Sequence, residues 1–466
     1  MMTDRPKTLG ELRASGYRAK PVREEMRDNL IRKIRGGQTL FPGLIGFDDS
    51  VLPHLENAIL AGQDVILLGE RGQAKSRLIR QLVELLDEAV PAVAGCEIND
   101  DPFAPICRAC RDRAVAEGDD VPIVWLTPDE RYGEKLATPD ITIADLIGEI
   151  DPIKVAEGRY LSDELTIHYG LVPRSNRGIF SINELPDLAE RIQVGLLNIM
   201  EERDVQIRGY RVRLPLDVFI VASANPEDYT NRGRIITPLK DRFGAQIRTH
   251  YPRTVDDEIG IMEQEARPLP KEAKDVFVPQ YMKEIVAEIT RLARRSPDVN
   301  QRSGVSVRAS ITDYETLLSN ALRRAIRLDE KEVVPRISDL YFLMPALSGK
   351  IEFETLDEGR EEQILEKLIA AGVLAVFNRS FNLDDLDETV AGFKGGLVVE
   401  TSDLSPAGSY VALLQKVPGL ERSVAHLKVG ERPAAVASAV EFVLEGLHLN
   451  KRLNKDRVSR RAHYRG

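Results

Sequence analysis

The segment "VILLGERGQAKS", residues 65–76, decides the fold. Its first four residues are apolar and predict a buried strand, and an amphipathic pattern over 76–86 predicts a helix. Between them lies G-x-x-x-x-A-K-S, which departs from the phosphate-binding pattern G-x-x-x-x-G-K-[ST] at one glycine. Such a loop surrounds an anion with backbone N–H groups and a helix N-terminus, and its lysine and hydroxyl bind phosphate and Mg²⁺. The segment therefore predicts a nucleotide site.

The missing glycine of this loop is Ala74. We expect alanine to be accepted there if its φ is negative or only mildly strained, with Gly72 as another flexible point. A chance turn is the alternative, and the strand before it and the helix after it argue against that. The residues expected to contact the nucleotide are Gly69, Glu70, Arg71, Gly72, Gln73, Ala74, Lys75, Ser76 and Arg77.

Further apolar segments predict a sheet around this first strand. They are "VPIVWLT" (121–127), "GIFSI" (178–182) and "VFIVASA" (218–224). Short apolar strands that alternate with helices, such as 51–60, indicate a parallel sheet with helices on both faces, an α/β fold. The remainder of the chain is mainly helical in pattern.

The sequence divides into four parts by pattern. We predict an N-terminal arm (1–40), a nucleotide-binding domain (41–252), a helical lid (253–350) and a mostly α-helical C-terminal region with a basic tail (351–466).

Polar side chains stand where the predicted strands end. Asn183 and Glu184 follow one strand, Asn225 follows the next, and Arg242 lies just beyond in "LKDRFG". Because the carboxyl ends of parallel strands meet at one sheet edge, we expect these groups to face the loop of residues 69–76.

Composition limits the partners and the cellular compartment to be expected. The chain has 466 residues, 43% hydrophobic and 30% charged, with a net charge of −10, which argues against attraction of its whole surface to nucleic acid or membrane. No apolar run approaches the roughly 18 residues that span a bilayer. The N-terminus has no apolar segment typical of a secretory signal, and three cysteines fit a reducing compartment. We expect a cytoplasmic protein with no membrane or nucleic-acid partner.

Residues 41–350 resemble AAA+ ATPases of the helix-2-insert group, which includes MoxR-type ATPases and the motor (I) subunit of magnesium chelatase. The likeness to the chelatase motor is the closer one, and it covers about two thirds of the chain. The segments that carry it are "LIGFDDSVLPHLENAILAG", "GERGQAKSRL", "GCEINDDPFAPICRAC", "RGIFSINELPDL", "VGLLNIMEERDVQIRG", "VASANPED" and "LKDRFG".

The resemblance implies an ATPase that uses ATP and Mg²⁺. Lys75 and Ser76 would bind phosphates and Mg²⁺, Glu184 would polarise the attacking water, and Asn225 would be the sensor that positions this water or the γ-phosphate. Arg242 would act as an arginine finger on the ATP of a neighbouring subunit, and Arg308 in "GVSVRASI" matches the second sensor. A finger in trans implies a ring, usually a hexamer.

The resemblance also implies two insertions. The helix-2 insert would be 147–178, and "ERDVQIRGYRVRLPLDV" (202–218) predicts a β-hairpin. In the family, such insertions face the pore or the partner. A rim loop that fixes subunit packing is the alternative.

Asn183 departs from the family pattern, which has aspartate there to hold Mg²⁺ through water. Asparagine keeps an oxygen acceptor and loses the charge. We expect weaker Mg²⁺ binding and slow hydrolysis, because the other groups are intact. A nucleotide-gated scaffold with little hydrolysis is the alternative.

The cysteines lie in a predicted insertion at about 95–120. Cys96, Cys107 and Cys110 have the spacing C-x10-C-x2-C, which would hold zinc if a fourth ligand were present. We expect reduced thiols that pack this insertion, with zinc as the alternative. The basic tail "NKRLNKDRVSRRAHYRG" is expected to be solvated, or to contact nucleic acid, an acidic partner or a neighbouring subunit.

The resemblance favours a ring motor that remodels a protein partner with a von Willebrand factor A-type domain. A motor for Mg²⁺ or Co²⁺ insertion into a tetrapyrrole is the alternative, and region 351–466, which has no counterpart in that motor, favours the first. An enhancer-dependent transcription activator is disfavoured, because "DELTIHYGLVP" is not the GAFTGA loop of that class.

Overall fold

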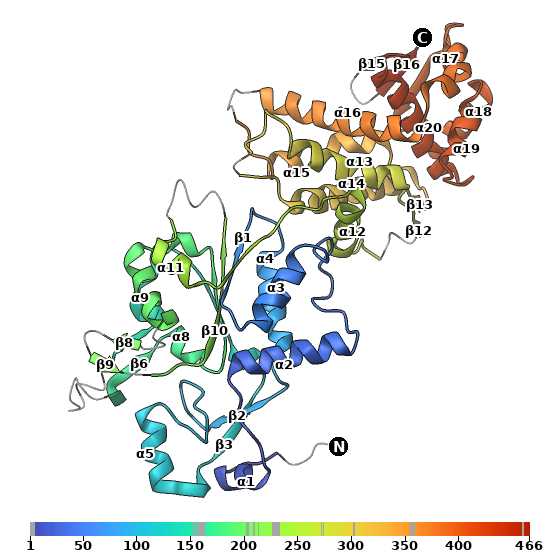
Figure 1. Cartoon of the computed structure of the whole chain (residues 1–466). Coiled ribbons are helices and arrows are strands. Elements are labelled where there is room, and N and C mark those ends of the chain that lie inside the picture. The colour runs from blue at the N-terminus through green and yellow to red at the C-terminus, as the bar shows by residue number, and fades with distance from the viewer. Residues whose placement is uncertain are drawn as a thin grey trace. The chain divides into compact units, whose positions relative to one another are not determined.

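The computed structural model describes residues 5–151, 153, 156, 164–201, 205–207, 210–212, 214–225, 234–271, 273, 275–301, 303–354, 359–458 and 461–466. The chain forms two compact units, Met1–His250 and Tyr251–Gly466 (Figure 1).

A five-stranded parallel sheet is the centre of the first unit. Its strands lie in the order β11-β1-β10-β7-β4, and every neighbouring pair is parallel. The strands are β1 (Val65–Leu68), β4 (Tyr132–Leu136), β7 (Gly178–Asn183), β10 (Val218–Ala224) and β11 (Ala245–Arg248). The predicted parallel α/β fold is confirmed, and β1 and β10 have the predicted bounds.

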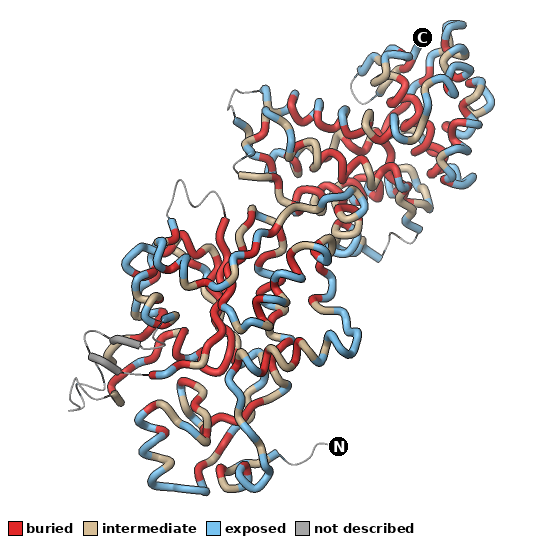
Figure 2. The backbone as a smooth tube through the Cα atoms, viewed as in Figure 1, coloured by how far each residue is buried: buried red, intermediate tan, exposed pale blue. Residues whose placement is uncertain are grey.

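Both faces of this sheet are buried under helices (Figures 1 and 2). Val65 and Leu67 pack in the core of one face, while Ile66 between them packs in the core of the other. The first core also contains residues of α2 (Val22–Arg35), α3 (Val51–Leu60) and α4 (Lys75–Gln81). The second contains residues of α9 (Glu190–Glu201) and α11 (Thr237–Arg242). Continuous apolar strands such as β10 follow from this two-sided burial.

The segment at 121–127 does not enter the central sheet. It forms β3 (Ile123–Leu126), which pairs antiparallel with β2 (Val90–Val93). Only Ile123 of its four residues is buried, so the prediction of a buried sheet strand was wrong here. The fifth strand of the sheet is β4, "YGEKL", an edge strand whose mixed polarity gave no apolar run to detect.

The N-terminal arm is part of the first unit's core. Met26 and Leu30 of α2 are fully buried, and Glu25 forms a buried two-bonded ion pair with Arg131 at 2.8 and 2.7 Å. Because a buried charge is costly without its partner, this pair ties α2 to the domain. The short helix α1 (Leu9–Ala14) precedes it.

Other elements of the first unit lie in or next to its insertions. They are α5 (Arg108–Glu117), α6 (Ile143–Leu146), α8 (Leu171–Arg174), β5 (Gly148–Ile150), β6 (Ile167–Tyr169), β8 (Val205–Ile207) and β9 (Tyr210–Val212). β8 and β9 pair antiparallel, which confirms the predicted hairpin. Within the predicted helix-2 insert, β5 pairs with β6, and residues 152, 154, 155 and 157–163 lie outside the described residues.

The second unit is mainly helical, as predicted. Its helices are α12 (Val255–Glu265), α13 (Gln280–Ala293), α14 (Val307–Leu328), α15 (Met344–Ser348), α16 (Arg360–Ser380), α17 (Asp387–Phe393), α18 (Ala407–Lys416), α19 (Leu420–His426) and α20 (Pro433–Leu449). Tyr281 of α13 stacks on Phe442 of α20 with ring centroids 4.4 Å apart. One core therefore contains residues of the predicted lid and of the C-terminal region, and α20 runs through it almost wholly buried (Figure 2).

The basic tail is folded into a small sheet, and most of its described charged residues remain exposed, as expected of a solvated tail. β15 (Asn454–Val458) and β16 (Arg461–Arg465) pair with each other, and β16 pairs with β14 (Val399–Ser402). Arg461 contacts Glu400 at 3.3 Å, and Arg465 contacts Asp456 at 2.8 Å. The tail's positive charges are thus partly balanced by acids of the same chain. Among the described residues, no helix is long and apolar enough to cross a membrane.

Candidate functional site

The phosphate-binding loop joins β1 to α4 at the carboxyl edge of the sheet. Glycine suits its first position, because a Cβ on Gly69 would lie 1.9 Å from the Thr249 hydroxyl and 2.2 Å from Gln73 Oε1 and would displace both side chains. The Thr249 hydroxyl donates to Gln73 Oε1 over 2.7 Å, and the Glu70 N–H donates to the same oxygen over 3.1 Å. Gln73 therefore links the loop to the residue that follows β11.

Ala74 adopts the left-handed conformation, with φ +52° and ψ +16°. Of the two conditions stated for alanine, a negative φ or mild strain, the structure shows the second, since the turn into α4 has a left-handed residue where the pattern has glycine. An L-residue in this conformation costs roughly 1–2 kcal/mol. Gly72 also has a positive φ, +76°. Left-handed residues alternating with others in such a loop turn backbone N–H groups toward one side, as an anion-binding loop requires.

Lys75 joins the loop to the predicted sensor. Its ammonium group donates to the carbonyl oxygen of Glu70 over 2.8 Å and to Asn225 Oδ1 over 2.7 Å. Both Lys75 and Asn225 are buried, and Asn225 directly follows β10, the strand beside β1. The structure thus brings these two predicted residues together. Ser76, the next residue, is an exposed second residue of α4.

Asn183 and Glu184 lie at the end of β7. Glu184 is left-handed, with φ +56°, and its N–H donates to the hydroxyl of Ser223 over 3.3 Å. The same hydroxyl donates to Asn183 Oδ1 over 3.2 Å. Ser223, in β10, was not predicted as a site residue, although its place two residues before Asn225 puts it on the strand that carries the sensor. It couples the ends of β7 and β10.

Sequence reasoning also missed Glu134, in the edge strand β4. Its Oε1 accepts a hydrogen bond from Asn183 Nδ2 over 2.6 Å. Arg80 of α4 binds both oxygens of this carboxylate at 3.0 and 3.1 Å. Burial opposes ionisation of Glu134, but the hydrogen bonds from Arg80 and Asn183 outweigh it and hold the pKa of Glu134 below its usual value. A carboxylate therefore lies beside Asn183, where the family pattern has aspartate.

The predicted arginines lie on different units. Arg242 ends α11 and is held by Glu201 of α9, with Nε 3.2 Å from the carboxylate. Its side chain keeps 28% of its surface exposed, so the guanidinium is accessible from outside the chain. Arg308 is the second residue of α14 in the second unit.

The three cysteines come together in the insertion between β2 and β3. Cys107 and Cys110 are buried, Cys96 is half-buried, and all three are free thiols. Their sulfurs and a carboxylate oxygen of Asp100 all lie within 4.8 Å of one another. Asp100 is the fourth candidate ligand that the cysteine spacing could not reveal.

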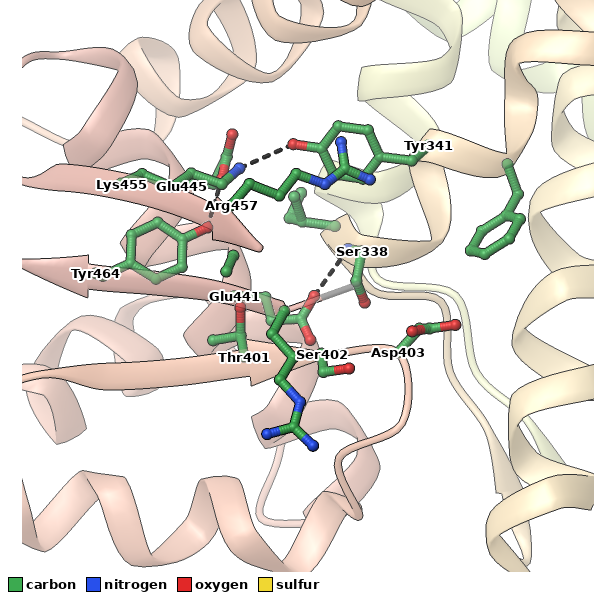
Figure 3. Close-up of a pocket in the computed structure, with 14 residues that line it drawn as sticks. Ser338, Tyr341, Thr401, Ser402, Asp403, Glu441, Glu445, Lys455, Arg457 and Tyr464 are labelled. Atoms are coloured by element: carbon green, nitrogen blue, oxygen red, sulfur yellow. Dashed lines mark hydrogen bonds and ion pairs between the residues drawn. The ribbon is translucent and has the colours of Figure 1, made fainter. Parts of the chain in front are cut away.

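A separate cavity of about 240 Å³ lies within the second unit (Figure 3). Glu445 on its wall accepts a hydrogen bond from Lys455 at 2.6 Å, and Lys455 also donates to the Tyr341 hydroxyl at 2.8 Å. Glu441 accepts from the Tyr410 hydroxyl at 2.6 Å and from the Ser338 N–H at 2.8 Å, and burial raises the pKa of Glu441. The Lys455–Glu445 bond fastens β15 to α20, and the bonds of Glu441 fasten α18 and Ser338 to the same helix, so we interpret this network as structural.

Comparison with known proteins identifies sequence relatives of the chain. No family model matches the chain. The chain is 27% identical over 245 residues to the chloroplastic magnesium-chelatase subunit ChlI-1 of Arabidopsis thaliana, which covers 51% of this chain and 54% of that protein. It is 28% identical over 235 residues to the magnesium-chelatase 38 kDa subunit of Rhodobacter capsulatus, covering 48% and 59%. The chain spans about half the length of these curated relatives.

Among solved structures, a chain of the complex between subunits BchI and BchD of magnesium chelatase matches at 21% identity, with 70% of this chain and 98% of that chain covered and a TM-score of 0.36. NtrX of Brucella abortus in complex with ATP matches at 14% identity, with 75% and 66% covered and a TM-score of 0.41.

The sequence relatives, the parallel sheet and the phosphate-binding loop at its edge agree with one another. The chain is a homologue of the magnesium-chelatase I subunits, and its fold is the α/β P-loop fold.

Proposed function

We propose that this protein is an Mg²⁺-dependent AAA+ ATPase that works as a ring motor and remodels a protein partner. The observation that carries the proposal is the position of Lys75, whose ammonium group lies between the loop carbonyl of Glu70 and the sensor oxygen of Asn225. A lysine in this place can exchange these oxygens for phosphate oxygens. This exchange would release Asn225, which follows β10, when phosphate binds.

The residues fit magnesium by their donor atoms. The Ser76 hydroxyl and Asn183 Oδ1 are oxygen donors, and the Glu134 carboxylate hydrogen-bonds to the same Asn183 side chain. Oxygen ligands are those that Mg²⁺ takes, usually with several waters retained. When bound with ATP, Mg²⁺ neutralises charge on the phosphates. Asn183 would hold such an ion less firmly than aspartate, so we propose that hydrolysis is slow.

Glu184 is proposed as the group that polarises the attacking water. Its left-handed backbone turns the chain sharply after β7, and its N–H is anchored on Ser223. A strained residue at a strand end suits a functional group, because the surrounding structure must hold it in place. Asn225, fixed by Lys75, would orient the same water or the γ-phosphate.

The assembly proposed is a ring, most simply a hexamer, in which Arg242 acts on the ATP of a neighbouring subunit. Its guanidinium is partly exposed and is positioned by Glu201. By resemblance, the partner carries a von Willebrand factor A-type domain, and the setting is the cytoplasm. Arg308 would be the second sensor.

Two other functions remain as alternatives. The first is a true chelatase motor for Mg²⁺ or Co²⁺ insertion, which the sequence relatives favour. Neighbouring genes discriminate here, because tetrapyrrole genes support this alternative and an adhesion-domain gene alone supports the remodelling motor. The second is a nucleotide-gated scaffold, which Asn183 favours.

The test is steady-state ATP hydrolysis across Mg²⁺ concentrations, with Glu184→Gln as the decisive variant. We expect wild-type turnover that the variant loses by a hundredfold or more, while both proteins bind ATP equally; a general base of this kind contributes about 10²–10⁴-fold. Glu190→Gln is the matched control, since Glu190 is an exposed first residue of α9.

Unchanged turnover in Glu184→Gln would remove Glu184 from the mechanism. Bound ATP without turnover at any Mg²⁺ concentration, in the wild type and in its mixture with a candidate partner, would replace the motor with the scaffold.

A further inference from the structure

The insertion between β2 and β3 brings four side chains to one point. Cys96 follows β2 in a turn, Cys107 is the residue that caps the N-terminus of α5, and Cys110 lies in the first turn of α5. Their three sulfurs and one oxygen of Asp100 lie within 4.8 Å of one another. The ligand atoms of one tetrahedral ion with bonds near 2.3 Å are about 3.8 Å apart, so this spacing fits a single metal atom.

Asp100 points independently to a ligand at this place. The residue is fully buried, with 0% of its surface exposed. Its Oδ2 accepts a hydrogen bond from the Cys107 N–H over 3.0 Å, while its Oδ1 has no hydrogen-bond partner among the described residues. A buried carboxylate oxygen without a partner is costly, and a cation beside it removes that cost.

The backbone is arranged to support metal-bound sulfur. The Asp100 N–H donates to Cys96 Sγ over 3.4 Å, and the Cys110 N–H donates to Cys107 Sγ over 3.4 Å. Hydrogen bonds of this kind orient ligands and stabilise the negative charge of a thiolate. Two of the three sulfurs are thus already directed by the main chain.

We propose that Cys96, Asp100, Cys107 and Cys110 bind one Zn²⁺ in a closed tetrahedral site. Three soft thiolates select zinc over magnesium or calcium, which prefer oxygen ligands alone. A four-iron cluster would require the sulfurs to surround a group of atoms instead of one ion. Four protein ligands leave no position for water, so the site is structural.

The metal holds the insertion against the segment that leads into β7. Asn99, next to Asp100, donates to the carbonyl oxygen of Arg174 over 2.9 Å, and Asn176 donates to the carbonyl oxygen of Ile98 over 3.0 Å. Because β7 ends in Asn183 and Glu184, zinc at the far end of this segment supports the strand that carries them. This proposal does not rest on ATP hydrolysis.

The experiment measures zinc in the untagged full-length protein by elemental analysis, with cobalt substitution as a second readout. The chain has only three cysteines. Sulfur-to-cobalt charge-transfer absorption therefore reports on these three ligands and on nothing else in the protein. We expect one equivalent of zinc per chain and a tetrahedral cobalt spectrum with three thiolates.

The variants separate ligation from packing. Cys107→Ser should lose zinc, and the milder Asp100→Asn should keep the fold and the three-thiolate cobalt spectrum while its zinc affinity falls by more than about tenfold. Asp112→Asn is the matched control, because Asp112 lies on α5 with its side chain 65% exposed and pairs with Arg108. It should bind zinc as the wild type does.

Zinc removal by a chelator should also increase hydrogen exchange in residues 94–120 and 171–177, and zinc should reverse this. Zinc well below one equivalent in wild type, with no uptake by the chelator-treated protein, would overturn the proposal and leave three packed thiols. Equal zinc affinity in Asp100→Asn and wild type would overturn the assignment of Asp100.

Discussion

The amide of Asn183 donates a 2.6 Å hydrogen bond to the carboxylate of Glu134 on the neighbouring strand. The negative charge that the family pattern places at residue 183 is therefore present, one strand away. Arg80 binds that carboxylate from α4, four residues after Ser76 on the same helix face. The departure at Asn183 is accompanied by an acid next to it, which under the proposed function keeps a negative charge near the Mg²⁺ site.

Asn183→Asp should lower the Mg²⁺ concentration needed for half-maximal ATP hydrolysis by about three- to tenfold, corresponding to roughly 1 kcal/mol. The added carboxylate strengthens the attraction to the ion. It would also stand within hydrogen-bond distance of Glu134, so we expect a lower melting temperature without Mg²⁺ and a larger rise on Mg²⁺ addition. Turnover against Mg²⁺ and thermal melting check both parts.

The double variant Asn183→Asp with Glu134→Gln is the control for this repulsion. It should recover the metal-free melting temperature, because one of the two facing charges is gone. If Asn183→Asp leaves the Mg²⁺ dependence unchanged, the amide is neutral for metal binding. The interpretation that Asn183 weakens Mg²⁺ binding is then wrong.

Glu134 also shows what sequence could not predict. The loop at residues 69–76 and strands β1, β7 and β10 were predictable because long apolar runs and a fixed motif are local properties. The strand "YGEKL" has no such run, and its partner 49 residues away is set by strand pairing. Conversely, the apolar segment at 121–127 predicted a sheet strand that in fact pairs with β2.

The contacts of the basic tail, residues 450–466, also could not be predicted from sequence. Its lysines and arginines predict exposure, yet Lys455 is bound to Glu445 of α20, and Tyr464 is buried. Local composition records the charges of a segment, whereas their partners depend on the tertiary fold. The spacing of the cysteines predicted them as a group. Asp100 could be recognised as a candidate ligand only from the structure, which places its carboxylate oxygen beside the three sulfurs.

Ala74→Gly should stabilise the protein by up to about 1 kcal/mol. Glycine removes the cost of a left-handed alanine, roughly 1–2 kcal/mol. It also increases the conformational entropy of the unfolded chain, which offsets part of this gain in stability. Ala61→Gly is the matched control, since Ala61 is exposed and has φ −80°. Chemical denaturation of both variants measures the difference. Equal destabilisation by the two substitutions would contradict the left-handed conformation of residue 74.

Arg242→Ala should reduce ATP turnover by at least a hundredfold without loss of ATP binding, since fingers of this type contribute about 10³–10⁵-fold. The fold should tolerate the change, because its pair with Glu201 is exposed and exposed ion pairs contribute little to stability. Arg242→Lys keeps the charge without the planar fork and should recover little activity.

Subunit mixing tests whether this finger acts in trans. Wild type mixed with a Lys75→Ala variant should show activity that departs from proportionality to the wild-type fraction, because each active site depends on its neighbour. Strict proportionality, at concentrations where mixed rings form, would mean independent sites and would rule out the finger in trans.

Asp313 of α14 should make the stability of the protein depend on pH. It is fully buried, both of its oxygens lack a hydrogen-bond partner among the described residues, and burial raises its pKa well above the usual value. The folded state therefore holds this proton more tightly than the unfolded chain does. The resulting stability is fully present below the ordinary carboxyl pKa of about 4 and is lost as pH rises toward the raised pKa.

Asp313→Leu should therefore raise the free energy of unfolding near neutral pH by about 1–3 kcal/mol, the range for an unsatisfied buried polar group. Asp313→Asn is the matched control: it keeps a buried polar group but cannot ionise, so it should remove only the pH-dependent part. Glu441, whose pKa burial also raises, contributes a slope of the same sign, so the measurement is the difference between variant and wild type in denaturation across pH. Parallel curves for all three proteins would show that Asp313 does not titrate on folding and would refute this assignment.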